Sequence, residues 1–117
     1  MPTVVRLEPG SRMSEAAVHN GTVYLAGQVA NDPAQDIGGQ TRDVLAQIDR
    51  LLAAAGSDKS MLLMVQIFLA DMSEFEGMNA AWDAWVPSGN PPPRATVQAS
   101  LARPGWKVEI VVTAAVK

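Results

Sequence analysis

An arginine and a glutamate near the end of the chain are the residues whose types and spacing could do chemistry. Arg94 follows the proline run Pro91–Pro93 and opens a predicted strand, and Glu109 lies near the start of the next predicted strand. Each proline locks φ and lacks an N–H, so the approach to Arg94 is rigid and extended. A guanidinium on such an arm, with a carboxylate on a neighbouring strand, could hold a small carboxylate-bearing molecule and act on it.

The same pair has a plainer interpretation. An arginine on an edge strand in solvent and a cross-strand ion pair are commoner than a catalytic site, and the residue types alone favour that reading. His19 is the only histidine and there is no cysteine, so no metal site and no thiol nucleophile is expected.

Composition bounds the remaining classes of function. The chain has 117 residues, with 48% hydrophobic and 18% charged residues and a net charge of −3, which predicts a single domain over residues 1–117 with an apolar core. The nine basic residues are scattered, so nucleic acid is not an expected partner. No signal-like or membrane-length apolar segment stands out, which favours a cytoplasmic protein that does not bind a membrane.

Hydrophobic periodicity and turn residues predict the elements that position Arg94 and Glu109. Val44, Leu45, Ile48, Leu51, Leu52 and Ala55 give one apolar stripe on a first helix, and Gly38-Gly39 is predicted to lie in the loop before it. Ser73 and Glu76 form a predicted capping box for a second helix. The predicted strands are 4–7, 16–19, 22–28, 61–69, 94–101 and 107–116, and the helices are 41–55 and 73–86.

These elements predict an α+β fold in the order β-β-β-α-β-α-β-β. A single sheet of five or six strands with both helices packed on one face fits this order. In the last strand, one face is wholly apolar, and the other carries Glu109 with Val111. We expect this second face to include Met64 and Arg94 as well, and such a mixed face suits a subunit interface that encloses a polar site.

Several segments together resemble the RidA (YjgF-type) family of reactive-intermediate deaminases, in order and spacing over nearly the whole chain. These segments are Tyr24-Leu25-Ala26-Gly27-Gln28, Ala54-Ala55-Gly56, Phe68-Leu69-Ala70-Asp71, the helix with Asn79, Pro93-Arg94 with Thr96-Val97, and Val108-Glu109-Ile110. The helix 78–86 and the tail 107–110 look most like the YoaB-like branch.

The resemblance implies a chorismate-mutase-like fold and a homotrimer with clefts between subunits. It also implies a cofactor-free, metal-free deaminase of the 2-iminobutanoate/2-iminopropanoate type, which hydrolyses 2-imino or 2-enamino acids to 2-keto acids and ammonia. Arg94 would clamp the substrate carboxylate, and Glu109 would position or deprotonate the attacking water. Thr96, Gly27 and Asn79 map onto further substrate-binding positions.

The chain departs from the family pattern at three places. A tyrosine expected shortly before the second strand is absent from Met13-Ser14-Glu15, Ala26 replaces a small polar residue before Gly27, and Thr96 stands where a cysteine often occurs. Two readings therefore stay open: a deaminase, and a non-catalytic protein of the same fold that binds small carboxylate metabolites.

Overall fold

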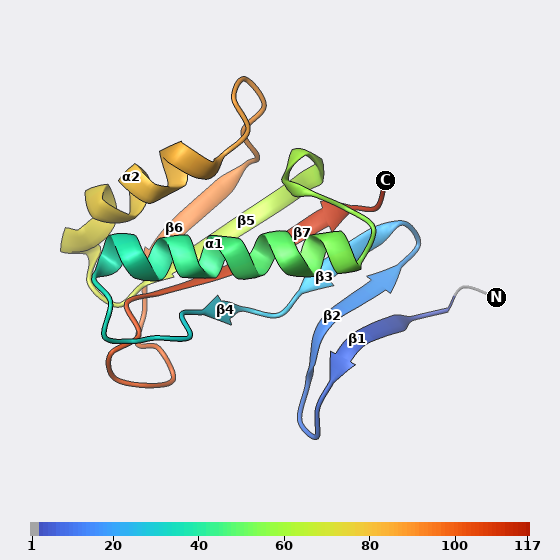
Figure 1. Ribbon diagram of the computed structural model, residues 1–117, viewed down its shortest axis with the longest axis horizontal. Coiled ribbons are helices and arrows are strands. Elements are labelled where there is room, and N and C mark those ends of the chain that lie inside the picture. The colour runs from blue at the N-terminus through green and yellow to red at the C-terminus, as the bar shows by residue number, and fades with distance from the viewer. Residues whose placement is uncertain (1–2) are drawn as a thin grey trace.

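The computed structural model describes residues 3–117 and shows two helices lying on one face of a mixed sheet (Figure 1). The strands are Val5–Pro9 (β1), Ser14–His19 (β2), Thr22–Leu25 (β3), Gln28–Val29 (β4), Leu62–Leu69 (β5), Arg94–Gln98 (β6) and Val108–Ala115 (β7). The helices are Ile37–Ala54 (α1) and Phe75–Trp85 (α2), with 3-10 turns at Lys59–Met61 (η1) and Met72–Glu74 (η2). The predicted fold class and order of elements are confirmed, except that the third predicted strand is broken into β3 and β4.

In the sheet, β5 lies between β6, which begins with Arg94, and β7, which contains Glu109. The order is β1-β2-β3-β7-β5-β6, with β4 also paired to β7. β5 and β6 are parallel, because α2 carries the chain back between them, whereas β5 and β7 are antiparallel. The strands that begin with Arg94 and hold Glu109 are therefore not neighbours, which corrects the prediction that they form an adjacent pair.

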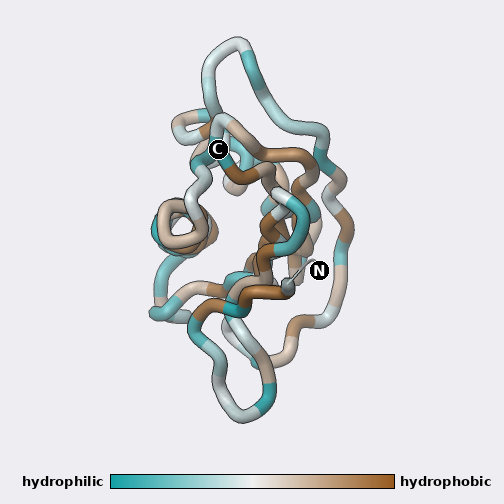
Figure 2. Tube along the Cα trace, turned by 90° about the vertical axis from the view of Figure 1, so that its right-hand side faces the viewer, coloured by the Kyte–Doolittle hydropathy of each residue, from teal (hydrophilic) through white to brown (hydrophobic). Residues whose placement is uncertain are grey.

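The core lies between the helices and one sheet face. Figure 2 shows the sheet from the side, with the coil of α1 on one side and the strands on the other. The predicted stripe of α1 is confirmed: Val44, Ile48 and Leu51 are among its fully buried residues. They pack with alternate residues of β5 and β7, such as Ile67 and Ile110. This packing leaves the opposite face of the sheet without a helix.

Both helices begin differently from the prediction. α1 starts at Ile37 rather than Thr41, because the Asp36 carboxylate accepts a hydrogen bond from Gly39 N at 2.8 Å and caps the helix there. Gly38-Gly39 is thus in the first turn of the helix, not in a loop. The capping box at Ser73 and Glu76 is also wrong, since Ser73 lies in η2, where its N–H donates to Asp71.

A close helix contact fixes α2 over the sheet. A Cβ built at Gly77 would lie 2.6 Å from Ile37 Cγ2, so glycine lets α2 approach the start of α1. This approach places one face of α2 against β6, the strand whose first residue is Arg94. Within residues 3–117, no helix is long and apolar enough to span a membrane.

The buried Gln40 side chain, in the first turn of α1, joins two loops. Its Nε2 lies 3.1 Å from Pro33 O and 2.9 Å from Gly105 O, and its Oε1 accepts from Lys107 N at 2.9 Å. Gln40 is 0% exposed, so these groups have little access to water. The loop before α1 and the loop before β7 are therefore held together by a single amide.

Replacing Gln40 by leucine should lower the free energy of unfolding by about 3 kcal/mol, because buried backbone groups would lose their partners. Urea denaturation should show an earlier midpoint with an unchanged slope. Gln35→Leu is the matched control, since Gln35 Nε2 donates to exposed Asp32 O and to the Asp43 carboxylate, which keeps its other hydrogen bonds when Gln35 is replaced. We expect the control to cost less than about 1 kcal/mol. An equal loss of unfolding free energy in the two variants would show that the hydrogen bonds of Gln40 between the two loops add no particular stability.

Candidate active site

Arg94 lies at the rim of the sheet, where its guanidinium contacts uncharged groups of α2. Nη2 donates to Asn79 Oδ1 at 2.7 Å, and Nη1 lies 3.9 Å from Met78 Sδ. Arg94 Cζ is also 5.2 Å from the Trp82 ring centroid and 5.9 Å from that of Phe75. None of the ion pairs within residues 3–117 includes Arg94, so a half-buried positive charge remains without a carboxylate partner.

Glu109 lies on the other face of the sheet, over Gly27. A Cβ added at Gly27 would lie 2.9 Å from Glu109 Cδ and would collide with Oε2. The absence of a side chain at position 27 therefore makes room for the Glu109 carboxylate. The chain leaves β3 just before Gly27 and rejoins the sheet as β4, where Val29 pairs with Glu109.

The strand register shows that Arg94 and Glu109 cannot meet within one subunit. Arg94 pairs with Val65, whose side chain is buried beneath the helices, whereas Glu109 pairs with Phe68 on the uncovered face. Two inter-strand spacings and three residues along the strand separate their Cα atoms by about 14 Å. The prediction that Arg94 shares a face with Glu109, Val111 and Met64 is therefore wrong.

The remaining predicted site residues divide between the two halves. Asn79 contacts Arg94, and Thr96 points to the same face as Arg94 because it pairs with buried Ile67. Gly27 belongs with Glu109. The structure thus gives one group of Arg94, Asn79 and Thr96 at the rim by α2, and a second group of Gly27 and Glu109 on the uncovered face.

The uncovered face is rich in exposed apolar side chains. Tyr24 is 52% exposed, Val97 47% and Met64 37%, and half-buried Val111 and Phe68 lie among them by register. Monomeric soluble proteins seldom leave such a continuous apolar surface in water. This face has the character of a protein interface, and Glu109 lies on it.

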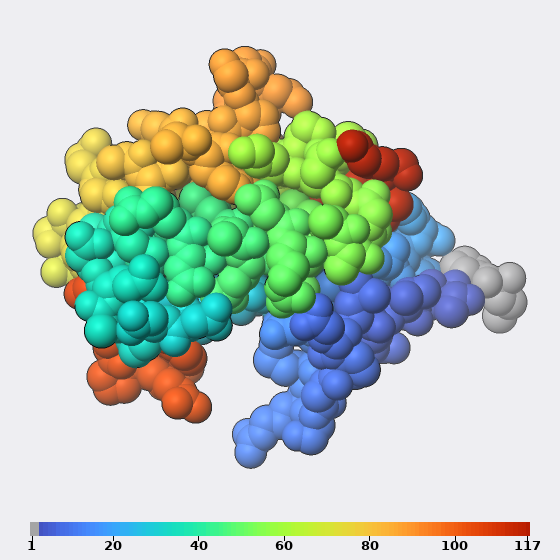
Figure 3. All heavy atoms as spheres, viewed as in Figure 1, coloured from blue at the N-terminus to red at the C-terminus, as the bar shows by residue number. Residues whose placement is uncertain are grey.

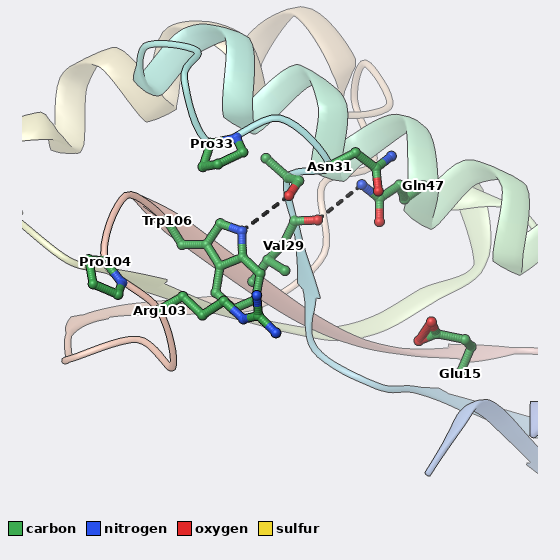
Figure 4. A pocket seen from close by; sticks show the side chains of 9 residues that line it. Glu15, Val29, Asn31, Pro33, Gln47, Arg103, Pro104 and Trp106 are labelled. Carbon is green, nitrogen blue, oxygen red and sulfur yellow. Dashed lines mark hydrogen bonds between the residues drawn. The ribbon is translucent and has the colours of Figure 1, made fainter. Parts of the chain in front are cut away.

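A cavity of about 460 Å³ opens beside β4 (Figure 4). Val29 lines it, as do Arg103 and Trp106 from the loop before β7 and Glu15 from β2. Figure 3 shows that loop and the β1–β2 hairpin on either side of a hollow below α1. Because Val29 pairs with Glu109, the cavity begins one strand away from the Glu109 carboxylate.

The walls of this cavity are held by side chains that the sequence analysis did not single out. Trp106 Nε1 donates to Ala30 O at 3.2 Å, and Arg103 Cζ lies 5.6 Å from the Trp106 ring centroid. Gln40 ties the same loops from behind. A tryptophan beside Pro104-Gly105 in a loop was the available signal, because a tryptophan N–H usually finds a hydrogen-bond partner when its ring is buried.

Within residues 3–117, no three His, Asp or Glu side chains come together in a way that could hold a metal ion.

Asp43, behind the cavity, has a pKa below its usual value. Burial acts to raise this pKa, but hydrogen bonds from Gln47 and from the N–H groups of Asn31 and Asp32 outweigh that effect. Asp43 is thus an ionised structural group that holds the loop around Asn31, which forms part of the cavity wall.

The arrangement of two helices on a twisted mixed sheet, with an arginine at one rim and a glutamate on the bare face, defines a YjgF-type protein. A crystal structure of a YjgF family member from Neisseria meningitidis superimposes with a TM-score of 0.96 and 46% identity, covering 98% of this chain and 96% of that one. A Pseudomonas aeruginosa structure gives a TM-score of 0.95 at 46% identity, covering 98% and 100%.

The chain belongs to the family described as Endoribonuclease L-PSP, whose profile matches residues 3–116. It is 49% identical over 114 residues to the RutC family protein YoaB of Escherichia coli, covering 97% of this chain and 99% of that protein. A RutC family protein of Haemophilus ducreyi is also 49% identical, over 113 residues and 97% of each chain. The predicted resemblance to this family and to YoaB is therefore confirmed.

Proposed function

We propose that the protein is a cofactor-independent deaminase that hydrolyses 2-imino and 2-enamino acids, such as 2-aminoacrylate, to 2-keto acids and ammonia. The observation that supports this most directly is the state of Arg94. Its guanidinium is half-buried, oriented by neutral groups and free of any carboxylate partner within residues 3–117. Such a group is suited to bind the carboxylate of a small acid through two parallel hydrogen bonds.

The chemistry requires little beyond positioning and proton transfer. With Arg94 holding the carboxylate, water adds to C2 of the protonated imine while Glu109 accepts a proton from it. In the tetrahedral adduct Glu109 returns this proton to nitrogen, the C2–N bond breaks and ammonia leaves, and the hydroxyl group gives its proton to solvent as it becomes the keto group, which replaces the proton that the imine took up. One water is consumed for each ammonia released, so no oxidant or other co-reactant is needed.

The two halves of the site suggest a homotrimer in which each cleft combines two subunits. Arg94, Asn79 and Thr96 lie at the rim of β6, and Glu109 lies on the apolar face that a neighbouring subunit would cover. Packing the rim of one subunit against the bare face of the next would bring Arg94 toward the partner's Glu109. The cavity beside Val29 would then offer room for the side chain of the substrate.

Light scattering should give a mass three times the 12.4 kDa of the chain. Val97→Glu places a charge on the exposed apolar face and should produce smaller species with little deamination, because burying an unpaired carboxylate at an interface is costly. Ala46→Glu, on the exposed side of α1, is the matched control and should leave the trimer intact. A wild-type mass of one chain at micromolar concentration would contradict this assembly.

The direct test of the activity generates 2-aminoacrylate in situ and follows pyruvate formation. Because the imine also hydrolyses in water, the result to measure is the acceleration above the protein-free rate. A rate that rises in proportion to protein concentration supports the deaminase. Tight keto-acid binding with no acceleration would instead favour the alternative, a non-catalytic protein that binds small carboxylate metabolites.

A further inference from the structure

One face of α2 is built around Arg94. Phe75, Met78, Asn79 and Trp82 follow the spacing of neighbouring positions on a helix, and each contacts the guanidinium. Asn79 is the polar member of this set, and it was expected to bind substrate. We infer that Asn79 is instead a positioning residue, which holds Arg94 through an uncharged acceptor and so leaves its positive charge for the ligand. This inference rests on the proposed function.

The contact fixes how both side chains are oriented. A guanidinium has donors and no acceptor, so it is the Asn79 oxygen that must face Nη2, as the 2.7 Å contact shows. This bond uses one of the five N–H groups of Arg94. The Trp82 and Phe75 rings restrict the guanidinium further. Arg94 is thus held in one orientation before a ligand arrives, which reduces the entropy lost on binding.

The lack of charge on the Asn79 acceptor matters as much as its position. A carboxylate at position 79 would sit at the same distance from Nη2 and would form a half-buried ion pair, which water screens only in part. A substrate carboxylate would then have to compete with an anion built into the protein. The carboxyl groups elsewhere on α2, Glu76 and Asp83, are on exposed positions and form no ion pair with Arg94.

Positioning and simple packing predict opposite results for Asn79→Asp. If Asn79 only stabilises the folded chain, aspartate should serve as well or better, because the new ion pair keeps the hydrogen bond. If Asn79 keeps Arg94 available, aspartate should preserve the fold and remove anion binding. We expect the Kd for 2-ketobutyrate, measured by calorimetry, to rise by about 100-fold in Asn79→Asp and by about 10-fold in Asn79→Ala.

The kinetic pattern should agree with the binding data. In Asn79→Ala, KM for the imine should rise by about 10-fold, while kcat changes by less than about threefold, because Glu109 and the water are unaffected. The thermal midpoint of Asn79→Asp should be no lower than that of Asn79→Ala. Asn20→Asp adds the same charge at the exposed β2–β3 turn and should leave Kd and KM unchanged. Wild-type affinity in either Asn79 variant would overturn the inference.

A readout that needs no ligand separates this inference from the proposed function. In nitrogen NMR spectra of the wild-type protein, the two Nη groups of Arg94, assigned by comparison with Arg94→Lys, should give separate signals because the bond to Asn79 slows rotation about Cζ–Nη2. In Asn79→Ala these signals should merge. Identical spectra would overturn the positioning role. A wild-type protein that binds no keto acid yet shows the restrained Arg94 would contradict the proposed function alone.

Discussion

Arg94→Ala should lose both the binding of short 2-keto acids and the hydrolysis of 2-aminoacrylate. The guanidinium is oriented by Asn79 and Trp82 of α2, and its removal takes away the cation that we propose binds the substrate carboxylate. Calorimetry with 2-ketobutyrate should show a Kd raised by at least about 100-fold, since hydrogen bonds to charged groups are worth about 1.5–3 kcal/mol each. In the assay that generates 2-aminoacrylate in situ, the rate of pyruvate formation should fall to the protein-free rate.

Arg94→Lys tests whether shape as well as charge matters at this position. An ammonium group keeps the positive charge but cannot make two parallel bonds to a carboxylate, and it cannot stack its plane on Trp82. We expect an affinity between those of the wild-type protein and Arg94→Ala. Arg42→Ala, which removes an exposed arginine from α1, should bind normally. Equal affinity in all four proteins would remove Arg94 from the site.

Local patterns in the sequence were sufficient to predict the elements themselves. The stripe from Val44 to Leu52 gave α1, and Asn20-Gly21 gave the tight turn between β2 and β3, where both residues have positive φ. The start of α1 was missed because Gly38-Gly39 was interpreted by its intrinsic preference. The Asp36 cap and the burial of Gln40 outweigh a helix cost of about 1 kcal/mol per glycine.

Strand neighbours were harder to predict than strands. The chain from Arg94 to Glu109 reads like two strands joined by a turn, which invites a hairpin, yet β5 lies between β6 and β7. The available signal was the strand–helix–strand run from Leu62 to Gln98. A helix between two strands usually returns the chain to a parallel neighbour, so it favours pairing β6 with β5. That pairing would have argued against treating β6 and β7 as the two strands of one hairpin.

The structure divides the candidate site residues between two groups, where the sequence suggested a single face. Asn79 contacts Arg94, and Gly27 contacts Glu109, yet both contacts depend on how distant segments pack, which no local pattern contains. The face each side chain occupies follows from register, and register was not available. The cavity wall at Trp106 also depends on a tertiary contact, its hydrogen bond to Ala30 O.

Glu109→Gln should reduce turnover by about 100-fold or more while keto-acid binding survives. Glutamine keeps the size of the side chain and its ability to hydrogen-bond, but its amide cannot accept the proton that water must lose. A variant that is less stable, yet hydrolyses 2-aminoacrylate at the wild-type rate per folded trimer, would falsify the catalytic role of Glu109 and favour the binding-protein alternative.

Gly27→Ala provides a matched test in which the charge of Glu109 is retained and its position is changed. The added methyl group would occupy the space of the carboxylate, and the end of the Glu109 side chain can swing away at small cost to the fold. We expect a thermal midpoint near that of the wild-type protein, unchanged binding of 2-ketobutyrate at Arg94, and a rate lowered by about 10-fold or more, because a misplaced base cannot reach its water. A normal rate in Gly27→Ala would show that proton transfer does not depend on the place that Gly27 gives to Glu109.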